Sequence, residues 1–254
     1  MGRRATSVAD GDRWVFNRLA TDYRARPGYP AALVKRLLEL AGGPGAGVAD
    51  LGAGSGLLSL PLALGGARVV AVEPAAAMLA VLRERCAGHP VVPVHAAAED
   101  TGLGDRAVAL VVAADVLQWL DPELAGREAA RILPTGGALA VVEARLSAEP
   151  FPAAIAELLR RANPRARPRP PERLAQFFRA AGATPSCREA WHHAEALSPG
   201  RLDAVLRSLS LVGPALGPRA LGRLLAEAGR LAELHGGAVW ARDILLTWGR
   251  RGPT

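Results

Sequence analysis

The 254-residue sequence predicts an α/β fold with a mainly parallel sheet, on three observations. Short apolar runs of strand length recur along the chain and alternate with segments of helical periodicity. Strands separated by helical crossovers form parallel sheets with right-handed connections. The chain is long enough for one such domain and too short for two ordinary ones with a linker.

The expected elements follow in chain order. A first helix begins near Trp14 and ends before Pro27, because proline cannot continue a helix. A second helix begins at Pro30, ends near Leu40 and is closed by the glycine pair 42–43. Strands are then expected near 47–51, 68–72, 91–95, 108–114 and 137–143, alternating with helices near 57–64, 75–86 and 122–132.

After Glu149 this alternation changes, and helices become more frequent. Residues 163–173 alternate proline and arginine, which favours an extended surface loop. Residues 1–12 are expected to be a disordered tail, and 13–254 a single domain. The later elements are helices near 151–161, 171–181, 198–211 and 217–235, with strands near 184–193 and 238–248.

The turn after the first predicted strand has the sequence DLGAGSG, with Gly52, Gly54 and Gly56 at alternate positions. Glycine lets a ligand approach the backbone closely. The spacing differs from the dinucleotide pattern G-x-G-x-x-G because position 57 is leucine, so a nucleoside without phosphate fits better. Glu73 ends the next strand, where open α/β sheets bind ligands, and its carboxylate can accept hydrogen bonds from both ribose hydroxyls. The alternative is an ordinary turn beside a solvated glutamate.

Composition narrows the functional classes. The net charge of +7 comes almost entirely from scattered arginines, with Lys35 as the single lysine, which disfavours a nucleic-acid surface. Cys86 and Cys187 lie far apart, so neither a disulfide framework nor a metal site is expected. The first residues lack the apolar core of a signal peptide, and no run of about 18 apolar residues occurs. A cytoplasmic protein without membrane association is therefore expected.

The motif DLGAGSG, followed by VEP at 72–74, resembles the first two motifs of class I S-adenosylmethionine (SAM) dependent methyltransferases. The chain is most similar to the small bacterial methyltransferase type 11, or trans-aconitate-methyltransferase-like, group. The patterns RPGYP, AE, HW and RVLxPGG of that group correspond here to ARPGYP at 25–30, AAED at 97–100, QW at 118–119 and RILPTGG at 131–137.

The resemblance implies a Rossmann-like, mainly parallel seven-stranded sheet with helices on both faces. It also implies a helical lid from about 13–40 and 197–236. The implied activity is methyl transfer from SAM to an oxygen, nitrogen or carbon atom of a small organic molecule, such as a secondary metabolite, in a biosynthetic step that leaves S-adenosylhomocysteine. A monomer and a homodimer both remain open.

The resemblance also implies a set of cofactor contacts. The glycine loop approaches the methionine part of SAM, Glu73 holds the ribose, and residues after the third strand lie beside the adenine. Arg26 is expected to pair with the cofactor's carboxylate, although a surface arginine is the alternative. Ala97 stands where many relatives carry aspartate. The expected contacts are Tyr23, Arg26, Asp50, Gly52, Ala53, Gly54, Glu73, Pro74, Met78, Ala98, Glu99 and Ala114.

The acceptor side is less defined by the sequence. Candidates for the acceptor pocket are Asp115, Gln118 and Trp119 after the fourth strand and Trp191 on the sixth, and Gln118 replaces the histidine common in relatives. The catalytic candidates are His193 and His192. Adjacent strand residues point to opposite faces, so this pair does not readily chelate one metal. If the acceptor is a carboxylate or a free amine, positioning alone suffices and no base is needed.

Two other functions stay open at this point. A macromolecule methyltransferase is one, but the segment AADVLQWL lacks both the N/D-P-P-Y motif of amino-group nucleic-acid methylases and a Pro-Cys nucleophile. The second is a protein that binds SAM and catalyses a cyclisation or rearrangement without methyl transfer. The cofactor loop is compatible with both.

Overall fold

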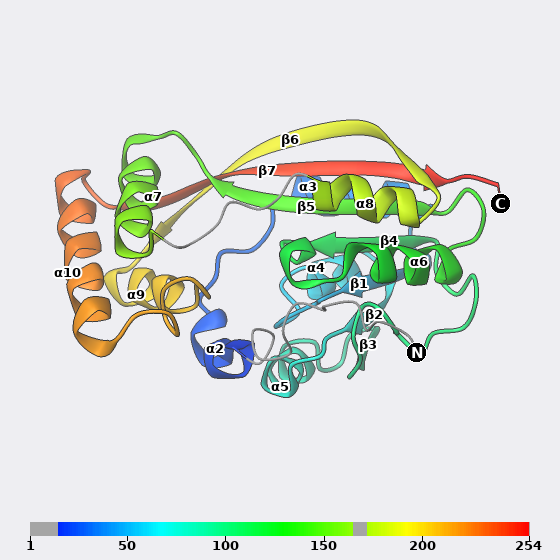
Figure 1. Ribbon diagram of the computed structural model, residues 1–254, viewed down its shortest axis with the longest axis horizontal. Helices are drawn as coiled ribbons and strands as arrows, with labels where there is room; N and C mark the ends of the chain where they lie inside the picture. Colours follow the sequence, from blue (N-terminus) through cyan, green and yellow to red (C-terminus); the bar gives the residue numbers. More distant parts are fainter. Residues whose placement is uncertain (1–14, 165–171, 254) are drawn as a thin grey trace, which may run out of the picture.

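The structure, a computed structural model, describes residues 15–164 and 172–253 and contains a seven-stranded sheet (Figure 1). The strand order is β3-β2-β1-β4-β5-β7-β6. Strands β1 to β5 pair in parallel, and β7 lies antiparallel between β5 and β6. The predicted Rossmann-like, mainly parallel sheet is confirmed. The strands are β1 (Gly47–Leu51), β2 (Arg68–Val72), β3 (Val91–Val94), β4 (Leu110–Ala114), β5 (Ala138–Leu146), β6 (Ala183–Leu197) and β7 (Ala238–Arg251).

Helices cover both faces of the sheet because successive strand residues bury their side chains on opposite sides. Ala49 and Leu51 of β1 belong to the hydrophobic cluster under α6 and α8, whereas Val48 belongs to the cluster under α3 and α4. Leu82 of α5 packs on Ala71 of β2. These helices are α3 (Ala31–Ala41), α4 (Ser59–Leu64), α5 (Ala76–Arg85), α6 (Pro122–Ile132) and α8 (Glu172–Ala180).

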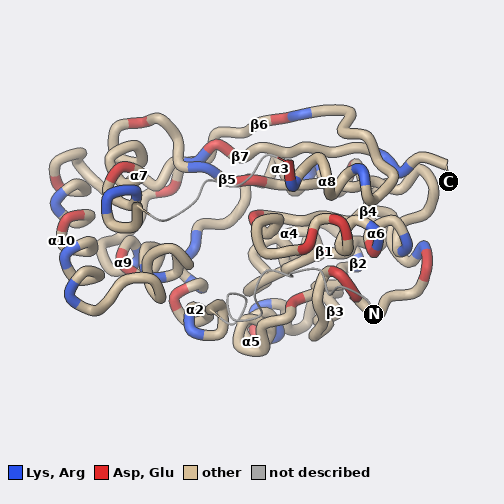
Figure 2. Tube along the Cα trace, viewed as in Figure 1, with Lys and Arg blue, Asp and Glu red and all other residues tan. Residues whose placement is uncertain are grey.

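Charged residues of both signs are interspersed along the chain (Figure 2). Several arginines form ion pairs across elements. Arg36 of α3 lies 2.9 Å from Glu189 of β6, and Arg131 of α6 lies 2.8 Å from Asp105. These arginines therefore contribute to contacts between elements.

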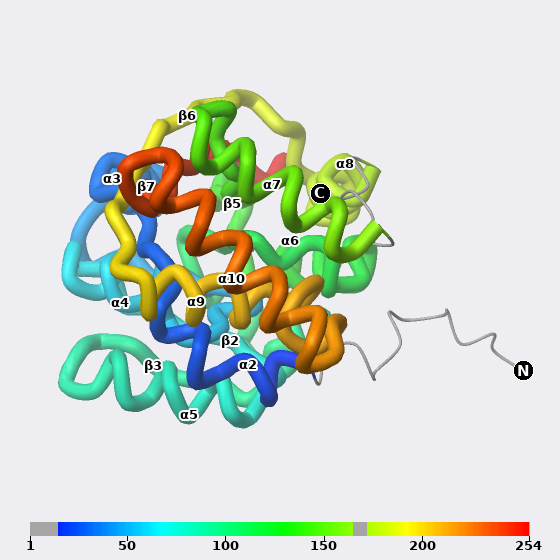
Figure 3. Tube along the Cα trace, turned by 90° about the vertical axis from the view of Figure 1, so that its left-hand side faces the viewer, coloured from blue at the N-terminus to red at the C-terminus, as the bar shows by residue number. Residues whose placement is uncertain are grey.

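A third group of helices lies beyond the carboxyl ends of the parallel strands, where β6 and β7 extend past the rest of the sheet (Figures 1 and 3). Ile155, Leu206, Leu224 and Trp240 contribute to one hydrophobic cluster there. Helix α2 packs against both α5 and α9, so it connects this group to the sheet domain. The elements are α2 (Val15–Tyr23), α7 (Pro150–Ala162), α9 (Pro199–Arg207) and α10 (Pro218–Leu234).

The largest differences from the predicted boundaries lie in the last third of the chain. Strands β6 and β7 run longer than predicted because they pair with each other along almost their whole length. Helix α9 ends at Arg207 rather than near 211, and the Ser208 hydroxyl donates 2.6 Å to the Val205 carbonyl there. The predicted tail at 1–12 and most of the loop at 163–173 lie outside the described residues. Within the described ranges, every helix is too short or too polar to cross a membrane.

Candidate functional site

The glycine loop after β1 is held in a backbone conformation that suits glycine. Gly52, Gly54 and Gly56 have φ angles of 69°, 55° and 79°, in the left-handed region that side chains disfavour. At Gly52 there is also no room for a side chain, because a Cβ atom would lie 2.3 Å from Cγ2 of Val116. The loop therefore presents bare backbone at the carboxyl edge of the sheet.

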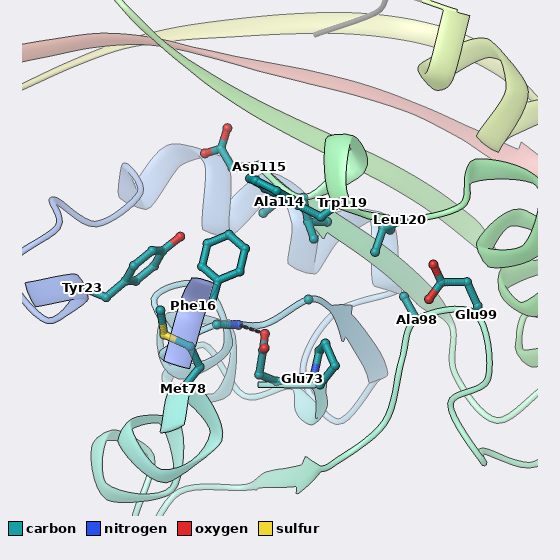
Figure 4. A pocket seen from close by; sticks show the side chains of 14 residues that line it. Phe16, Tyr23, Glu73, Met78, Ala98, Glu99, Ala114, Asp115, Trp119 and Leu120 are labelled. Carbon is teal, nitrogen blue, oxygen red and sulfur yellow. Dashed lines mark hydrogen bonds between the residues drawn. The ribbon is translucent and has the colours of Figure 1, made fainter. Parts of the chain in front are cut away.

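Glu73, directly after β2, fixes this loop in place (Figure 4). One carboxylate oxygen accepts a hydrogen bond from the amide of Gly54 and the other from the amide of Ala75, both at 2.8 Å. The residue is only 6% exposed. Burial raises the pKa of the Glu73 carboxyl, and the two amide donors oppose that rise. Glu73 thus joins β2, the glycine loop and the start of α5.

Asp50, at the end of β1, is a buried carboxylate on the other side of the loop. Its Oδ2 accepts a hydrogen bond of 2.6 Å from the hydroxyl of Ser59 in α4. Burial raises the pKa of Asp50 to about 6, and the hydrogen bond acts in the opposite direction. This hydrogen bond joins the end of β1 to α4.

The loop and Glu73 form one wall of an open pocket of about 610 Å³, named here the first pocket. Figure 4 shows its side chains converging from α2, β2, α5 and β4. A hydrogen bond holds the Glu99 side chain in position: its Oε1 accepts from the amide of Asp121, at the start of α6, at 2.7 Å. The lining residues are Phe16, Tyr23, Gly52, Gly54, Glu73, Pro74, Met78, Ala98, Glu99, Ala114, Asp115, Val116, Trp119 and Leu120.

Aromatic side chains close the first pocket from the side of α2. The rings of Phe16 and Trp119 meet edge to face with centroids 5.1 Å apart, and Phe16 also contacts Tyr23 edge to face. Trp119, which was predicted for the acceptor pocket, lines the first pocket. Phe16 was not predicted to line it; its only signal in the sequence is the aromatic at the start of the first helix.

A second pocket continues on the other side of the glycine loop. Asp115, which follows β4, has a φ angle of 55°, a strained conformation for a residue with a side chain. Its Oδ1 accepts from the amide of Ala144 at 2.9 Å, and its Oδ2 from the hydroxyl of Tyr29 at 3.1 Å. The second pocket is lined by Tyr23, Arg26, Pro27, Tyr29, Asp50, Gly52, Ala53, Gly54, Leu57, Leu58, Ala114, Asp115 and Arg242.

Tyr29 and Arg242 are polar residues of the second pocket that were not among the predicted site residues. Burial and the neighbouring Asp115 raise the pKa of Tyr29 well above its ordinary value, so this phenol stays a neutral hydrogen-bond donor. Arg242 reaches the pocket from β7 and donates a hydrogen bond to the carbonyl of Gly28. Tyr29 lies in the motif ARPGYP, so the motif could have indicated it. Arg242 lies in no such motif, and its neighbours in the sequence do not indicate a pocket residue.

Arg26 lines the second pocket, but its guanidinium is already bound within the protein. Its Nε and Nη2 donate to the hydroxyl and the carbonyl of Ser208, and its Nη1 donates to the hydroxyl of Tyr23, each at 2.9 Å. The guanidinium also lies 3.9 Å from the centre of the Tyr23 ring. Arg26 therefore connects the end of α2 to the end of α9.

Four predicted residues lie outside both pockets. The amide of Gln118 donates 2.9 Å to the carbonyl of Asp115, within the turn after β4. Trp191 packs against the cluster under α3. His192 is exposed and its two ring nitrogens contact carboxylates of Asp243 and Glu149, at 3.1 and 3.0 Å.

His193 points to the opposite face of β6, where it pairs in register with Arg242. Partial burial and the nearby Arg242 lower the pKa of its imidazole, which therefore stays neutral near pH 7. His193 lines neither pocket.

Comparison with known proteins finds a family match in the central part of the chain. Residues 49–141 match the sequence model of a family described as methyltransferase domain. An uncharacterized methyltransferase of Mycobacterium tuberculosis and one of Mycobacterium bovis are each 41% identical over 119 residues, which is 47% of this chain and 47% of each relative. The match thus spans about half the length of these relatives.

Solved structures extend the similarity to almost the whole chain. A putative type II methyltransferase from Anaeromyxobacter dehalogenans superposes with a TM-score of 0.64 at 25% identity, covering 90% of this chain and 99% of that one. The [4+2]-cyclase SpnF superposes with a TM-score of 0.59 at 18% identity over 100% of both chains. A geranyl diphosphate methyltransferase in complex with GPP and sinefungin gives 0.52 at 17% identity over 87% of this chain and 78% of that one. The last two similarities concern the fold alone.

Proposed function

We propose that this chain transfers a methyl group from SAM to a small organic molecule, on the basis of the match of residues 49–141 to the methyltransferase-domain family. The observation that carries the proposal is the position of Glu73. Its buried carboxylate and the bare backbone of Gly54 form one wall of the first pocket. A ribose beside that carboxylate would lie against the glycine loop.

The residues of the first pocket fit an adenosine. A carboxylate accepts about four hydrogen bonds, and Glu73 uses two of these positions for backbone amides, which leaves room for two ribose hydroxyls. Met78 and Pro74 line the pocket and would supply apolar surface for the nucleoside. Ala98 and Glu99 also line it, and we propose that the adenine lies beside them. SAM when bound supplies the methyl group, carried on a sulfonium.

The chain's own residues then orient the two reactants and exclude water. Phe16, Tyr23 and Trp119 form an aromatic cover over the first pocket. We include α2, α9 and α10 in the proposal as a lid, because α2 carries two of these aromatics and packs on α9. Positioning without a general base is favoured, since both histidine candidates lie outside the pockets and Tyr29 holds its proton.

A cyclisation or rearrangement without methyl transfer is the second candidate. Gln118 stands where related sequences commonly have histidine, and the superposable SpnF is named as a cyclase. A macromolecular acceptor is disfavoured by the distribution of charge, because acidic and basic residues are interspersed (Figure 2). The acceptor is therefore proposed to be a small molecule.

Two experiments test the proposal. Calorimetry should detect SAM and S-adenosylhomocysteine binding to the purified protein at about micromolar concentration, in the range of ordinary cofactor affinities. Incubation with methyl-labelled SAM and small-molecule extracts should then yield a labelled product. Absence of binding at millimolar nucleoside would overturn the cofactor assignment. Binding together with an extract-dependent product that carries no label would favour the cyclisation.

A further inference from the structure

Arg242 enters the second pocket from the side of α7, α9 and α10 rather than from the glycine loop. In the sheet it pairs with Leu146 of β5, whereas β4 ends at Ala114, which pairs with Val142. At roughly 3.3 Å per residue, the backbone of Arg242 therefore lies about 13 Å further along β5 than the end of β4. The glycine loop and Arg242 thus belong to different walls of the second pocket.

The guanidinium of Arg242 is only partly satisfied by the residues that the structure describes. Its Nη2 donates to the carbonyl of Gly28, which is its one side-chain hydrogen bond within the described ranges, and its Nε is buried without an acceptor. A guanidinium carries several further N–H donors. A buried donor without a partner is unfavourable, so a ligand that accepts from this group would remove a penalty.

The charge of Arg242 forms no ion pair with any residue in the described part of the chain. Asp115 and Glu195 attract it electrostatically, but Glu195 is paired with Arg201. Burial lowers the pKa of Arg242 in spite of this attraction, and the neighbouring Arg26 acts in the same direction. A partly buried cation in this state is stabilised by an anion that a ligand brings.

The position of Arg242 points to the acceptor as the source of that anion. In the proposed function the cofactor lies against Glu73 and the glycine loop, so the acceptor has to reach the methyl group from the side away from the loop. Arg242 stands on that side. An anionic oxygen beside a guanidinium is less basic than a free one, so the group that Arg242 holds is a poor methyl acceptor itself.

We propose that Arg242 determines the class of acceptor: it binds the carboxylate or phosphate of a small organic anion, and another atom of that molecule receives the methyl group. The inference rests on the proposed function, which places SAM in the first pocket. The bond from Nη2 to Gly28 holds the guanidinium, so its planar fork is oriented before the acceptor binds. Arg242 then touches the substrate and selects it by charge.

The test measures how the wild-type protein binds three fragments that share one ring: benzoate, phenyl phosphate and the uncharged benzamide. Ligand-observed NMR follows each titration, with and without saturating S-adenosylhomocysteine. At least one of the two anions should bind about tenfold or more tightly than benzamide, because its hydrogen bond to Arg242 is charge-assisted. The tighter of the two anions identifies the acceptor as a carboxylate or as a phosphate.

Three variants locate the preference for anions. Arg242→Gln should remove it, and Arg242→Lys should keep part of it, since lysine retains the charge without the planar fork. Arg250→Gln is the matched control, because Arg250 is an exposed arginine of the same strand that also donates to a glycine carbonyl, that of Gly136, at 2.8 Å. It should leave all affinities unchanged. Urea denaturation shows which variants are folded, and Arg242→Lys carries the comparison if Arg242→Gln is not.

A wild-type protein without a preference for anions, or a preference that persists in Arg242→Gln, would overturn the inference. Anion binding that saturating S-adenosylhomocysteine abolishes would assign Arg242 to the cofactor and would overturn it too. The labelled product of the incubation with SAM should be retained by an anion exchanger, and a product without negative charge would contradict the recognition role.

Failure of the proposed function gives a different result. In that case the wild-type protein binds no S-adenosylhomocysteine at all. Binding of S-adenosylhomocysteine without any preference for anions would contradict only the assignment of Arg242. The two failures are therefore distinguishable.

Discussion

Replacing Glu73 with glutamine tests the nucleoside site most directly. The carboxylate holds the amides of Gly54 and Ala75, each at 2.8 Å, and is proposed to hold the ribose as well. A glutamine side chain offers one acceptor oxygen and one donor group. One of the two amides would therefore face a donor, and the ribose hydroxyls would lose a charged acceptor.

The expected magnitudes follow from these contacts. Losing a hydrogen bond to a charged group changes the free energy of binding by about 1.5–3 kcal/mol, so the dissociation constant of S-adenosylhomocysteine should rise about 10- to 150-fold. One buried amide left without an acceptor should lower the free energy of unfolding by about 1–3 kcal/mol. Glu73→Ala removes both acceptors and should destabilise the fold further.

The assay is calorimetric titration with S-adenosylhomocysteine, combined with urea denaturation to separate binding from stability. Glu84→Gln is the matched control, because Glu84 lies at the exposed end of α5, pairs with Arg24 and lines neither pocket. It makes the same chemical change and should leave the affinity of the nucleoside unchanged.

The pKa of Glu73 adds a second readout. Burial raises this pKa above its ordinary value of 4.5, and the ionised form is the one that accepts from the ribose. The affinity of the wild-type protein should therefore fall as the pH is lowered through the raised pKa, whereas Glu73→Gln should lack this fall. A folded Glu73→Gln variant with wild-type affinity at neutral pH would refute the reasoning.

Three further predictions concern the loop, its buried carboxylate and the histidines. Gly52→Ala should abolish nucleoside binding, because the new Cβ atom would clash with Val116. Gly102→Ala is the control, because Gly102 has the same φ of 69° with open space around it, and this variant should lose only about 1–2 kcal/mol of stability. Equal urea denaturation curves and equal binding curves for the two variants would contradict this prediction. The raised pKa of Asp50, about 6 against 3.8, means that its favourable contribution is present below pH 3.8 and is lost as the pH rises through 6. Between pH 4 and 7, the free energy of unfolding of the wild type should therefore fall by up to about 3 kcal/mol relative to that of Asp50→Asn. The prediction would be refuted if urea denaturation gave the same difference between the two proteins at every pH. His193→Ala and His192→Ala should each lower turnover less than about tenfold from pH 5.5 to 9, because neither histidine is expected to act as a general base. A positioned base contributes about 10²–10⁴-fold to the rate. A larger loss, together with loss of the acidic limb of the pH–rate profile, would instead support a catalytic histidine.

The local features of the first pocket could be predicted from the sequence. Strand–helix alternation determines the parallel sheet, because its connections leave few other topologies. The positions of Gly52, Gly54 and Glu73 at the sheet edge could be anticipated because they depend on backbone geometry and on strand ends, which neighbouring residues determine. Their contact at 2.8 Å follows once β1 and β2 pair in parallel.

Only the tertiary structure decided which distant residues complete the two pockets. Arg242 meets the carbonyl of Gly28 across 214 positions, and Arg26 meets Ser208 across 182. No periodicity or motif encodes such pairings, because they depend on how β7 extends past the sheet and on where α9 ends. The place of the histidine pair of β6 depends on tertiary structure for the same reason: the packing of the edge strand places His192 against Glu149 and outside both pockets.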